Sequence, residues 1–184
     1  MLLAKILLKI LLCLGVIVSV DCISNATPSA TASLDWTAKG RETGLPIPRF
    51  VSLKTTRARM RIGPAFEYAV KWLYQAPGLP LEITEEYGNW RQVRDCDGVS
   101  GWMHQSLLSG KRTAMVGPWL KQTIALRIEA RENSFEKAKL EPRVRVRILS
   151  CTVSWCDVAL NEDHIIGFIE KSALWGVYPQ EVIN

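Results

Sequence analysis

A cysteine and two histidines are the first candidates for catalysis in this sequence. Cys96 lies in the short segment Asp95-Cys-Asp-Gly98, and His104 and His164 are the two histidines of the chain. A catalytic thiolate needs a helix N-terminus or a nearby cation to lower its pKa, and an acyl-transfer site needs hydrogen-bond donors for the developing oxyanion. The segment around Cys96 is typical of a tight turn and offers neither, so we expect no enzyme activity.

The same turn resembles the start of a calcium-binding loop. Asp95 and Asp97 are followed by Gly98, but position twelve of such a loop would be Ser106, where calcium needs a glutamate. Two isolated histidines do not provide the spacing of a zinc site either. We therefore predict no metal site and no cofactor.

Aromatic residues are better candidates, and they point to binding. Successive side chains of a strand face opposite ways, so a core position at Val93 or Met103 places the neighbouring tryptophans on the outer face. The residues expected to share this outer surface are Phe66, Tyr68, Trp90 and Trp102. Grooves lined by such rings bind extended peptides. The alternative is that the rings fill a core or the contact between two domains.

Two runs of arginine alternate with apolar residues, at 57–61 and 143–147. One face of each strand would therefore be cationic and could contact carboxylates or lipid phosphates. The alternative is a solvated strand face that discourages edge-to-edge aggregation.

An internal repeat of about 65 residues organises the chain after residue 44. Residues 101–110 align with residues 167–176, and the apolar positions upstream alternate as they do in strands. The expected strands are 50–61, 69–75, 79–87, 90–94 and 99–103 in the first unit, and 123–127, 137–140, 144–149, 155–160 and 165–169 in the second. Five short strands in so few residues favour closure into a small barrel, and two such barrels are expected to dock on each other.

The first residues are typical of a secretory signal. Lys5 and Lys9 precede an apolar run over residues 10–20, and small residues follow up to Ala26. We expect a signal peptide over 1–26, a linker over 27–44, and barrels over 45–114 and 115–184. The protein would then be periplasmic or secreted, with no stable membrane span after cleavage; a retained N-terminal anchor is the alternative.

Charge and cysteines bear on the partner and the compartment. Without residues 1–26, which hold two lysines and one aspartate, the net charge is +4, which suits anionic envelope components. No dense basic patch supports nucleic-acid binding. Outside the signal, Cys96, Cys151 and Cys156 are an odd number, so at least one thiol is unpaired within the chain. Cys151 and Cys156 flank a four-residue turn and could form a disulfide in an oxidising compartment, or remain small apolar thiols.

Four motifs resemble the bacterial Src-homology-3 (SH3b) family, in particular its tandem form in exported proteins of alphaproteobacteria. They are Ala58-Arg-Met-Arg-Ile-Gly-Pro64, Gly88-Asn-Trp-Arg-Gln-Val-Arg-Asp95, Gly101-Trp-Met-His-Gln-Ser-Leu-Leu108 and Ala173-Leu-Trp-Gly-Val-Tyr-Pro179, within residues 50–182. The second repeat departs from the pattern, because residues 129–133 replace the Gly-Pro turn and Phe168 replaces a tryptophan.

The resemblance implies an all-β protein of two tandem five-stranded SH3-like barrels with a binding role. We therefore expect a non-catalytic exported module that recognises a cell-envelope protein or peptidoglycan. The alternative is a secreted effector or adaptor that docks a protein partner by strand-edge addition or through an aromatic groove.

Overall fold

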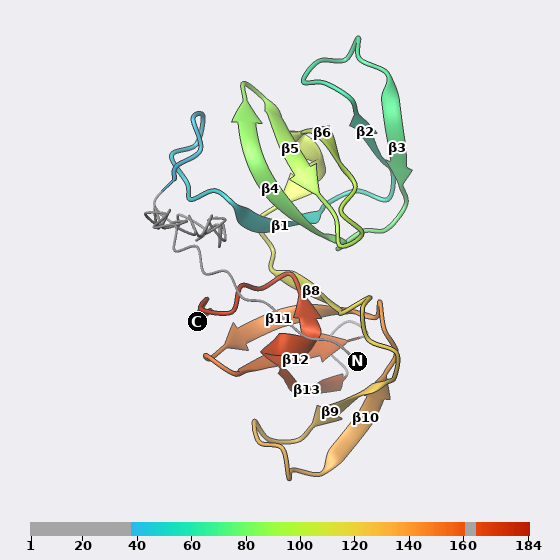
Figure 1. Cartoon of the computed structure of the whole chain (residues 1–184), viewed down its shortest axis with the longest axis vertical. Helices are drawn as coiled ribbons and strands as arrows, with labels where there is room; N and C mark the ends of the chain where they lie inside the picture. The colour runs from blue at the N-terminus through green and yellow to red at the C-terminus, as the bar shows by residue number, and fades with distance from the viewer. Residues whose placement is uncertain (1–37, 161–164) are drawn as a thin grey trace, which may run out of the picture. The chain divides into compact units, whose positions relative to one another are not determined.

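The computed structural model describes residues 38–160 and 165–184. Strands form two antiparallel seven-stranded sheets, each around its own apolar core (Figure 1). The described residues contain two short 3₁₀ turns and no α-helix, which confirms the all-β prediction. No helix in these two ranges is long and apolar enough to cross a membrane. The expected signal peptide, most of the expected linker and His164 lie outside the described residues.

The first sheet has the order β3-β2-β6-β5-β4-β1-β7. Its strands are β1 (Arg49–Leu53), β2 (Ala58–Arg61), β3 (Val70–Tyr74), β4 (Pro80–Tyr87), β5 (Trp90–Arg94), β6 (Ser100–His104) and β7 (Leu108–Ser109), with a 3₁₀ turn, η1, over Gln105–Leu107. Val93 and Met103 are fully buried, as alternation along β5 and β6 predicts. The single strand expected over residues 50–61 is wrong, because residues 54–57 separate β1 from β2.

The second sheet repeats this arrangement strand for strand, in the order β10-β9-β13-β12-β11-β8-β14. Its strands are β8 (Thr113–Val116), β9 (Ile124–Arg127), β10 (Glu136–Leu140), β11 (Arg145–Cys151), β12 (Trp155–Leu160), β13 (Ile165–Glu170) and β14 (Leu174–Trp175), with η2 over Lys171–Ala173. Seven strands replace the expected five in each unit. Strand β8 begins at Thr113 and belongs to the second sheet.

Equivalent side-chain contacts recur 66 residues apart. Arg61 Nη1 donates to the carbonyl oxygen of Tyr68 at 2.6 Å, and Arg127 Nη1 donates to that of Ser134 at 2.9 Å. Lys71 Nζ on β3 donates to a carbonyl of β6, two strands along the sheet, at 2.8 Å, and its counterpart 66 residues later on β10 donates likewise to a carbonyl of β13 at 2.8 Å. The two barrels are therefore duplicates in detail as well as in topology.

A bulge in β4 turns a carboxylate inward. The pairing with β5 shifts between Ile83 and Glu85, so that Glu86 and Arg91 lie opposite each other and both are buried. The Glu86 carboxylate accepts hydrogen bonds from the backbone N–H groups of Glu42 and Thr43, at 3.0 and 2.9 Å. Residues 38–44, the end of the expected linker, are therefore held against the first barrel.

The equivalent bulge in β11 places Cys151 opposite Cys156, and their Sγ atoms form a disulfide. Cys96 is the free cysteine of the described residues. The disulfide thus occupies, in the second barrel, the position that the Glu86 and Arg91 pair occupies in the first.

Hydrogen bonds and rings also connect the two barrels. The Tyr178 hydroxyl donates to Glu82 Oε1 at 2.8 Å, and Arg143 forms an ion pair with Asp97 at 2.6 Å. The Phe50 ring lies 4.6 Å from that of Tyr178, measured between centroids. The two barrels therefore pack against each other through both polar and aromatic contacts.

Candidate ligand-binding groove

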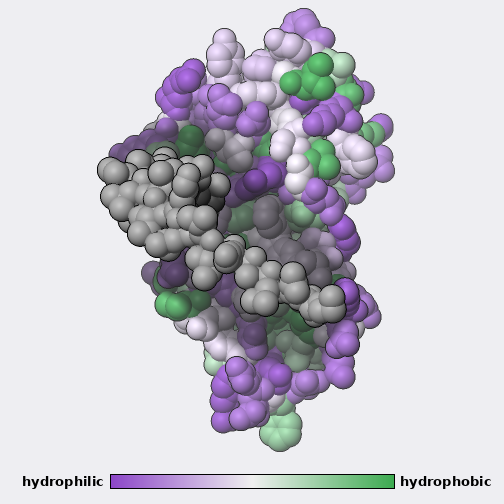
Figure 2. Space-filling model, viewed as in Figure 1, coloured by the Kyte–Doolittle hydropathy of each residue, from purple (hydrophilic) through white to green (hydrophobic). Residues whose placement is uncertain are grey.

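Exposed apolar side chains are scattered over the surface. Figure 2 shows hydrophilic residues over most of the visible face of the described part, with apolar residues in small separate areas. Single exposed hydrophobic residues are normal in proteins and do not by themselves mark a site. A binding site is better sought where such a residue joins a cavity.

One cavity, of about 420 Å³, lies on the outer face of the first barrel. Residues from β2, β3, β5, β6, η1 and the loops before and after β2 form its lining, which consists of Arg57, Arg59, Arg61, Phe66, Leu73, Trp90, His104 and Leu107. We call this cavity the first groove.

Three rings pack together in the first groove. Trp90 and His104 are directly opposite each other on β5 and β6, with centroids 5.5 Å apart and ring planes at 86°. Phe66 comes from the loop after β2, and its centroid lies 5.0 Å from Trp90 and 5.7 Å from His104. Edge-to-face packing of this kind favours a fixed arrangement of the rings. Trp90 is consequently only 8% exposed, whereas Phe66 is 65% exposed.

The four predicted ligand-binding residues do not all meet. Phe66 and Trp90 line the first groove, but Tyr68 and Trp102 do not. Tyr68 is exposed, and its ring lies directly over Gly63, where a Cβ atom would be 2.7 Å from it.

The expectation of two exposed indoles is also wrong, since Trp102 is only 9% exposed. Trp102 does share the outer face with Trp90, as strand parity predicts. On this face its cross-strand neighbours are Arg61 on β2 and Gln92 on β5.

The arginine run at residues 57–61 supplies a wall of the first groove. Ala58 and Met60 point into the core, so Arg57, Arg59 and Arg61 all face outward. Arg61 is held in place by its bond to the Tyr68 carbonyl, and its guanidinium carbon lies 5.8 Å from the centre of the Phe66 ring. Arg57 and Arg59 are exposed and form no ion pair with the described residues. The groove is therefore cationic beside an aromatic surface.

Sequence reasoning missed that the arginine run, His104 and Leu107 belong with Phe66 and Trp90. In the sequence the run and the aromatic residues are separate features, and His104 is only a possible base. The strand register is the one signal that could have placed these residues together. In an antiparallel β5–β6 hairpin whose turn is residues 95–99, Trp90 pairs with His104.

Cys96 and His104, two of the candidates for catalysis, have structural contacts. Burial raises the pKa of the Cys96 thiol, and its Sγ lies 3.6 Å from Met115 Sδ; a protonated thiol is a poor nucleophile. His104 is engaged in the groove and with Ser106, whose Oγ lies 2.8 Å from Nδ1. Among the described residues, no cluster of three or more His, Cys, Asp or Glu side chains could hold a metal ion.

Asp95 closes the turn that resembles a calcium loop. Its Oδ1 accepts hydrogen bonds from the N–H groups of Asp97 and Val99, at 3.0 and 2.9 Å. Its Oδ2 accepts one from the Tyr74 hydroxyl at 2.7 Å, and burial together with this bond raises the pKa of Tyr74. One carboxylate oxygen therefore closes the turn, and the other connects the turn to β3.

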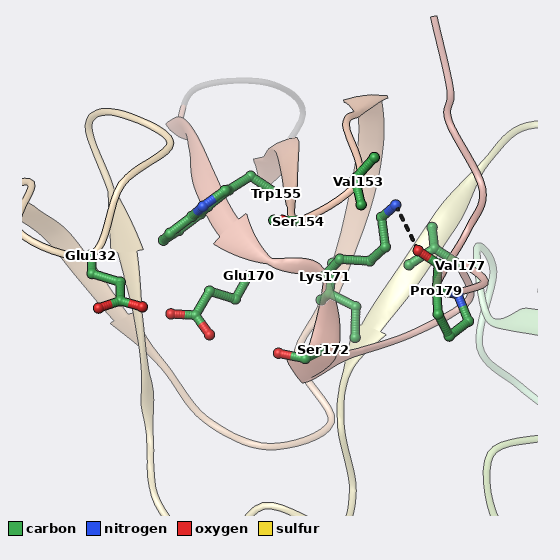
Figure 3. Close-up of a pocket in the computed structure, with 10 residues that line it drawn as sticks. Glu132, Val153, Ser154, Trp155, Glu170, Lys171, Ser172, Val177 and Pro179 are labelled. Carbon is green, nitrogen blue, oxygen red and sulfur yellow. Dashed lines mark hydrogen bonds between the residues drawn. The ribbon is translucent and has the colours of Figure 1, made fainter.

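The second barrel has a cavity of about 450 Å³ beside Trp155, the counterpart of Trp90. Figure 3 shows the carboxyl groups of Glu132 and Glu170 facing the same cavity as the Trp155 ring. By the repeat alignment, Glu132 replaces Phe66 and Glu170 replaces His104. We call this cavity the second groove; it keeps the tryptophan but not the other two rings.

Comparison with known families agrees with the geometry. Residues 54–110 match the family model of the bacterial SH3 domain, which indicates a binding module. No curated protein matches the chain. The matched segment runs from the turn before β2 to the end of β7 and contains every residue that lines the first groove. Residues 54–110 of this chain are therefore similar to the bacterial SH3 domain.

Proposed function

We propose that this chain is an exported, non-catalytic binding protein that recognises a cell-envelope protein or a peptidoglycan peptide through the first groove. The observation that carries the proposal is the ring cluster of Phe66, Trp90 and His104 beside three arginines. The signal-like residues 1–26 support export. Mass spectrometry of the exported protein should then find a mature N-terminus near Thr27.

The exposed face of Phe66 is the part of the groove that a ligand would cover. A ring that is 65% exposed gains burial when a ligand packs on it, while Trp90 and His104 behind it keep it in place. Preorganised rings bind with little loss of conformational entropy. Anionic groups of the envelope, such as the carboxylates of peptidoglycan peptides, would complement the arginine wall.

The test is retention of the protein on purified sacculi or on immobilised envelope proteins. Replacing Phe66 by alanine should weaken binding by about tenfold, the loss typical of a central aromatic contact. Phe135→Ala is the matched control, because Phe135 is 84% exposed on the equivalent loop of the second barrel. Equal retention of the Phe66→Ala variant and the unchanged protein would refute the proposed site.

The alternative is an adaptor that docks a protein partner by strand addition. Strand β3 is at the edge of its sheet, and Val70, Trp72 and Leu73 on it are exposed. An exposed apolar edge is a template for an added strand. This alternative predicts that the protein does not bind sacculi but binds a purified protein partner. Replacing Val70 by proline should abolish binding of that partner, whereas Phe66→Ala should leave it unchanged.

A further inference from the structure

The two barrels differ in charge at the positions equivalent to the lining of the first groove. Arg57 and Arg59 in the first groove correspond to Thr123 and Ala125 in the second barrel, since Arg59 pairs with Leu73 as Ala125 pairs with Lys139. Only Arg61 keeps its cationic counterpart, Arg127. The duplicated fold therefore has a cationic wall in one copy alone.

The replacement of Phe66 and His104 by Glu132 and Glu170 increases the difference in charge between the two grooves. Neither glutamate forms an ion pair with the described residues. Lys171 also lines the second groove, but its ammonium donates to the backbone carbonyls of residues 179 and 181, as Figure 3 shows for the first of these. Two carboxylates thus face the second groove, while no acidic side chain lines the first.

We propose that the first groove binds an extended acidic peptide segment and that the second groove rejects it. This inference rests on the proposed function and names the ligand class for the same site. The ligand's carboxylates contact Arg57, Arg59 and Arg61, and its apolar side chains contact Phe66 and the residues beside it.

The spacing of the arginines favours a peptide in extended conformation. Arg59 and Arg61 lie two positions apart on β2, so their Cα atoms are roughly 6.6 Å apart, and Arg57 immediately precedes this strand. Side chains on one face of an extended ligand have the same interval. Acidic residues at alternate positions would therefore face the arginines, which bind carboxylates in a planar, two-pronged geometry.

The aromatic and aliphatic part of the lining argues against a purely electrostatic surface. Phe66, Leu73, Trp90 and Leu107 line a cavity of about 420 Å³, which has room for one or two apolar side chains. Carboxylates in the second groove would repel the same ligand, and such repulsion adds specificity between two similar sites.

The experiment measures the binding of three fluorescein-labelled nonapeptides to the full chain purified after export. The peptides alternate leucine with glutamate, glutamine or lysine. The glutamate peptide should bind with a dissociation constant about tenfold lower than the glutamine peptide, equivalent to about 1.4 kcal/mol. Its advantage should decrease as salt is added, because salt screens exposed charges.

The key variant is Arg57→Thr/Arg59→Ala, which introduces the residues of the second barrel. Both arginines are exposed, so thermal unfolding should be unchanged, while the tenfold advantage of the glutamate peptide should disappear. The matched control is Lys121→Ala/Arg131→Ala, which removes the same charge from exposed positions of the second barrel and should keep the advantage.

A second variant tests for gain of binding. Thr123→Arg/Ala125→Arg combined with Glu132→Phe and Glu170→His should raise the stoichiometry of the glutamate peptide from one to two in calorimetry. A gain of this kind cannot come from misfolding.

Equal binding of the glutamate and glutamine peptides, or no binding of the glutamate peptide, would overturn the inference. Tighter binding to a thymidine decanucleotide or to phosphatidylglycerol vesicles would overturn the peptide assignment. Loss of sacculus binding in Phe66→Ala would leave the proposed function intact in each of these cases.

Discussion

Replacing Glu86 by glutamine removes a buried negative charge that holds three parts of the first barrel together. The carboxylate contacts the segment before β1 through Glu42 and Thr43, β1 through Arg49 at 2.6 Å, and β5 through Arg91 at 3.6 Å. Its side chain is fully buried. A glutamine of the same shape would leave the two guanidinium groups without their counter-charge.

The magnitude follows from the pKa of Glu86. Burial alone would raise this pKa, but the hydrogen bonds from Thr43 and Arg49 outweigh it and lower the pKa from 4.5 to about 2. At about 1.36 kcal/mol for each pH unit between the unfolded and folded pKa, the charge stabilises the fold by about 3 kcal/mol at pH 7. Breaking a buried ion pair on one side costs about 3–5 kcal/mol, which agrees with this value.

The assay is urea unfolding of the full chain, followed by circular dichroism, at several pH values. A folded-state pKa below the unfolded one means that the stabilisation is complete above about pH 5 and is lost as pH falls toward 2. The difference between the unchanged protein and Glu86→Gln should therefore be about 3 kcal/mol at pH 7 and less than half of that at pH 3.

The neighbouring variant Glu85→Gln is the control, because Glu85 is exposed on the same strand and its loss should change stability by less than about 0.5 kcal/mol. A Glu86→Gln penalty below about 1 kcal/mol at pH 7 would refute the reasoning. So would a penalty that stays constant between pH 7 and pH 3.

Two further predictions concern the disulfide and the close approach of β6 to β2 at Gly101. Cys151→Ser/Cys156→Ser should lower the free energy of unfolding by about 2 kcal/mol, the value expected for closing so short a loop, and dithiothreitol should destabilise the unchanged protein but not this variant. Gly101→Ala should lower the free energy of unfolding in urea by about 1–3 kcal/mol, because the added Cβ would lie 2.8 Å from the Arg61 carbonyl oxygen. Gly110→Ala is the control: a Cβ there meets open space, so the free energy of unfolding should not change.

Much of the fold follows from alternation in the sequence. The buried positions of Val93 and Met103, the β class and the duplication all come from residues that alternate with a period of two. The two-residue strands β7 and β14 are too short to show a period. The bulge between Ile83 and Glu85 is also invisible, because it reverses the direction of every later side chain on β4 without any change of residue type.

The groove was predictable only in part, because it is formed by side chains from separate strands. Parity places Trp90 on the outer face, but its burial depends on Phe66 folding over it from a loop. Trp102 has the same parity but is only 9% exposed, with Arg61 and Gln92 beside it on the neighbouring strands. Which arginines join the rings depends on the register of β2 against β6, which no local pattern encodes.

The two barrels have chemically different residue pairs at the same inward-facing position of their equivalent hairpins. After the bulge, the last inward-facing pair of the β4–β5 hairpin is Glu86 with Arg91, and that of the β11–β12 hairpin is the disulfide of Cys151 with Cys156. The buried Glu86 carboxylate needs hydrogen-bond donors, and the backbone N–H groups of residues 42–43 supply two of them. These bonds stabilise the charged carboxylate and also hold residues 42–43 against the barrel.

The disulfide needs no donors, and the backbone of Ile183 pairs with Cys151 at 2.8 and 3.0 Å instead. Acid therefore acts on the first barrel and on the segment that covers Glu86, because protonation removes the negative charge that the hydrogen bonds from Thr43 and Arg49 stabilise. Reductant acts on the second barrel, where the cross-link limits the unfolded chain. Because the first groove lies in the acid-sensitive barrel, ligand binding there should survive reduction of the disulfide while the two barrels remain folded.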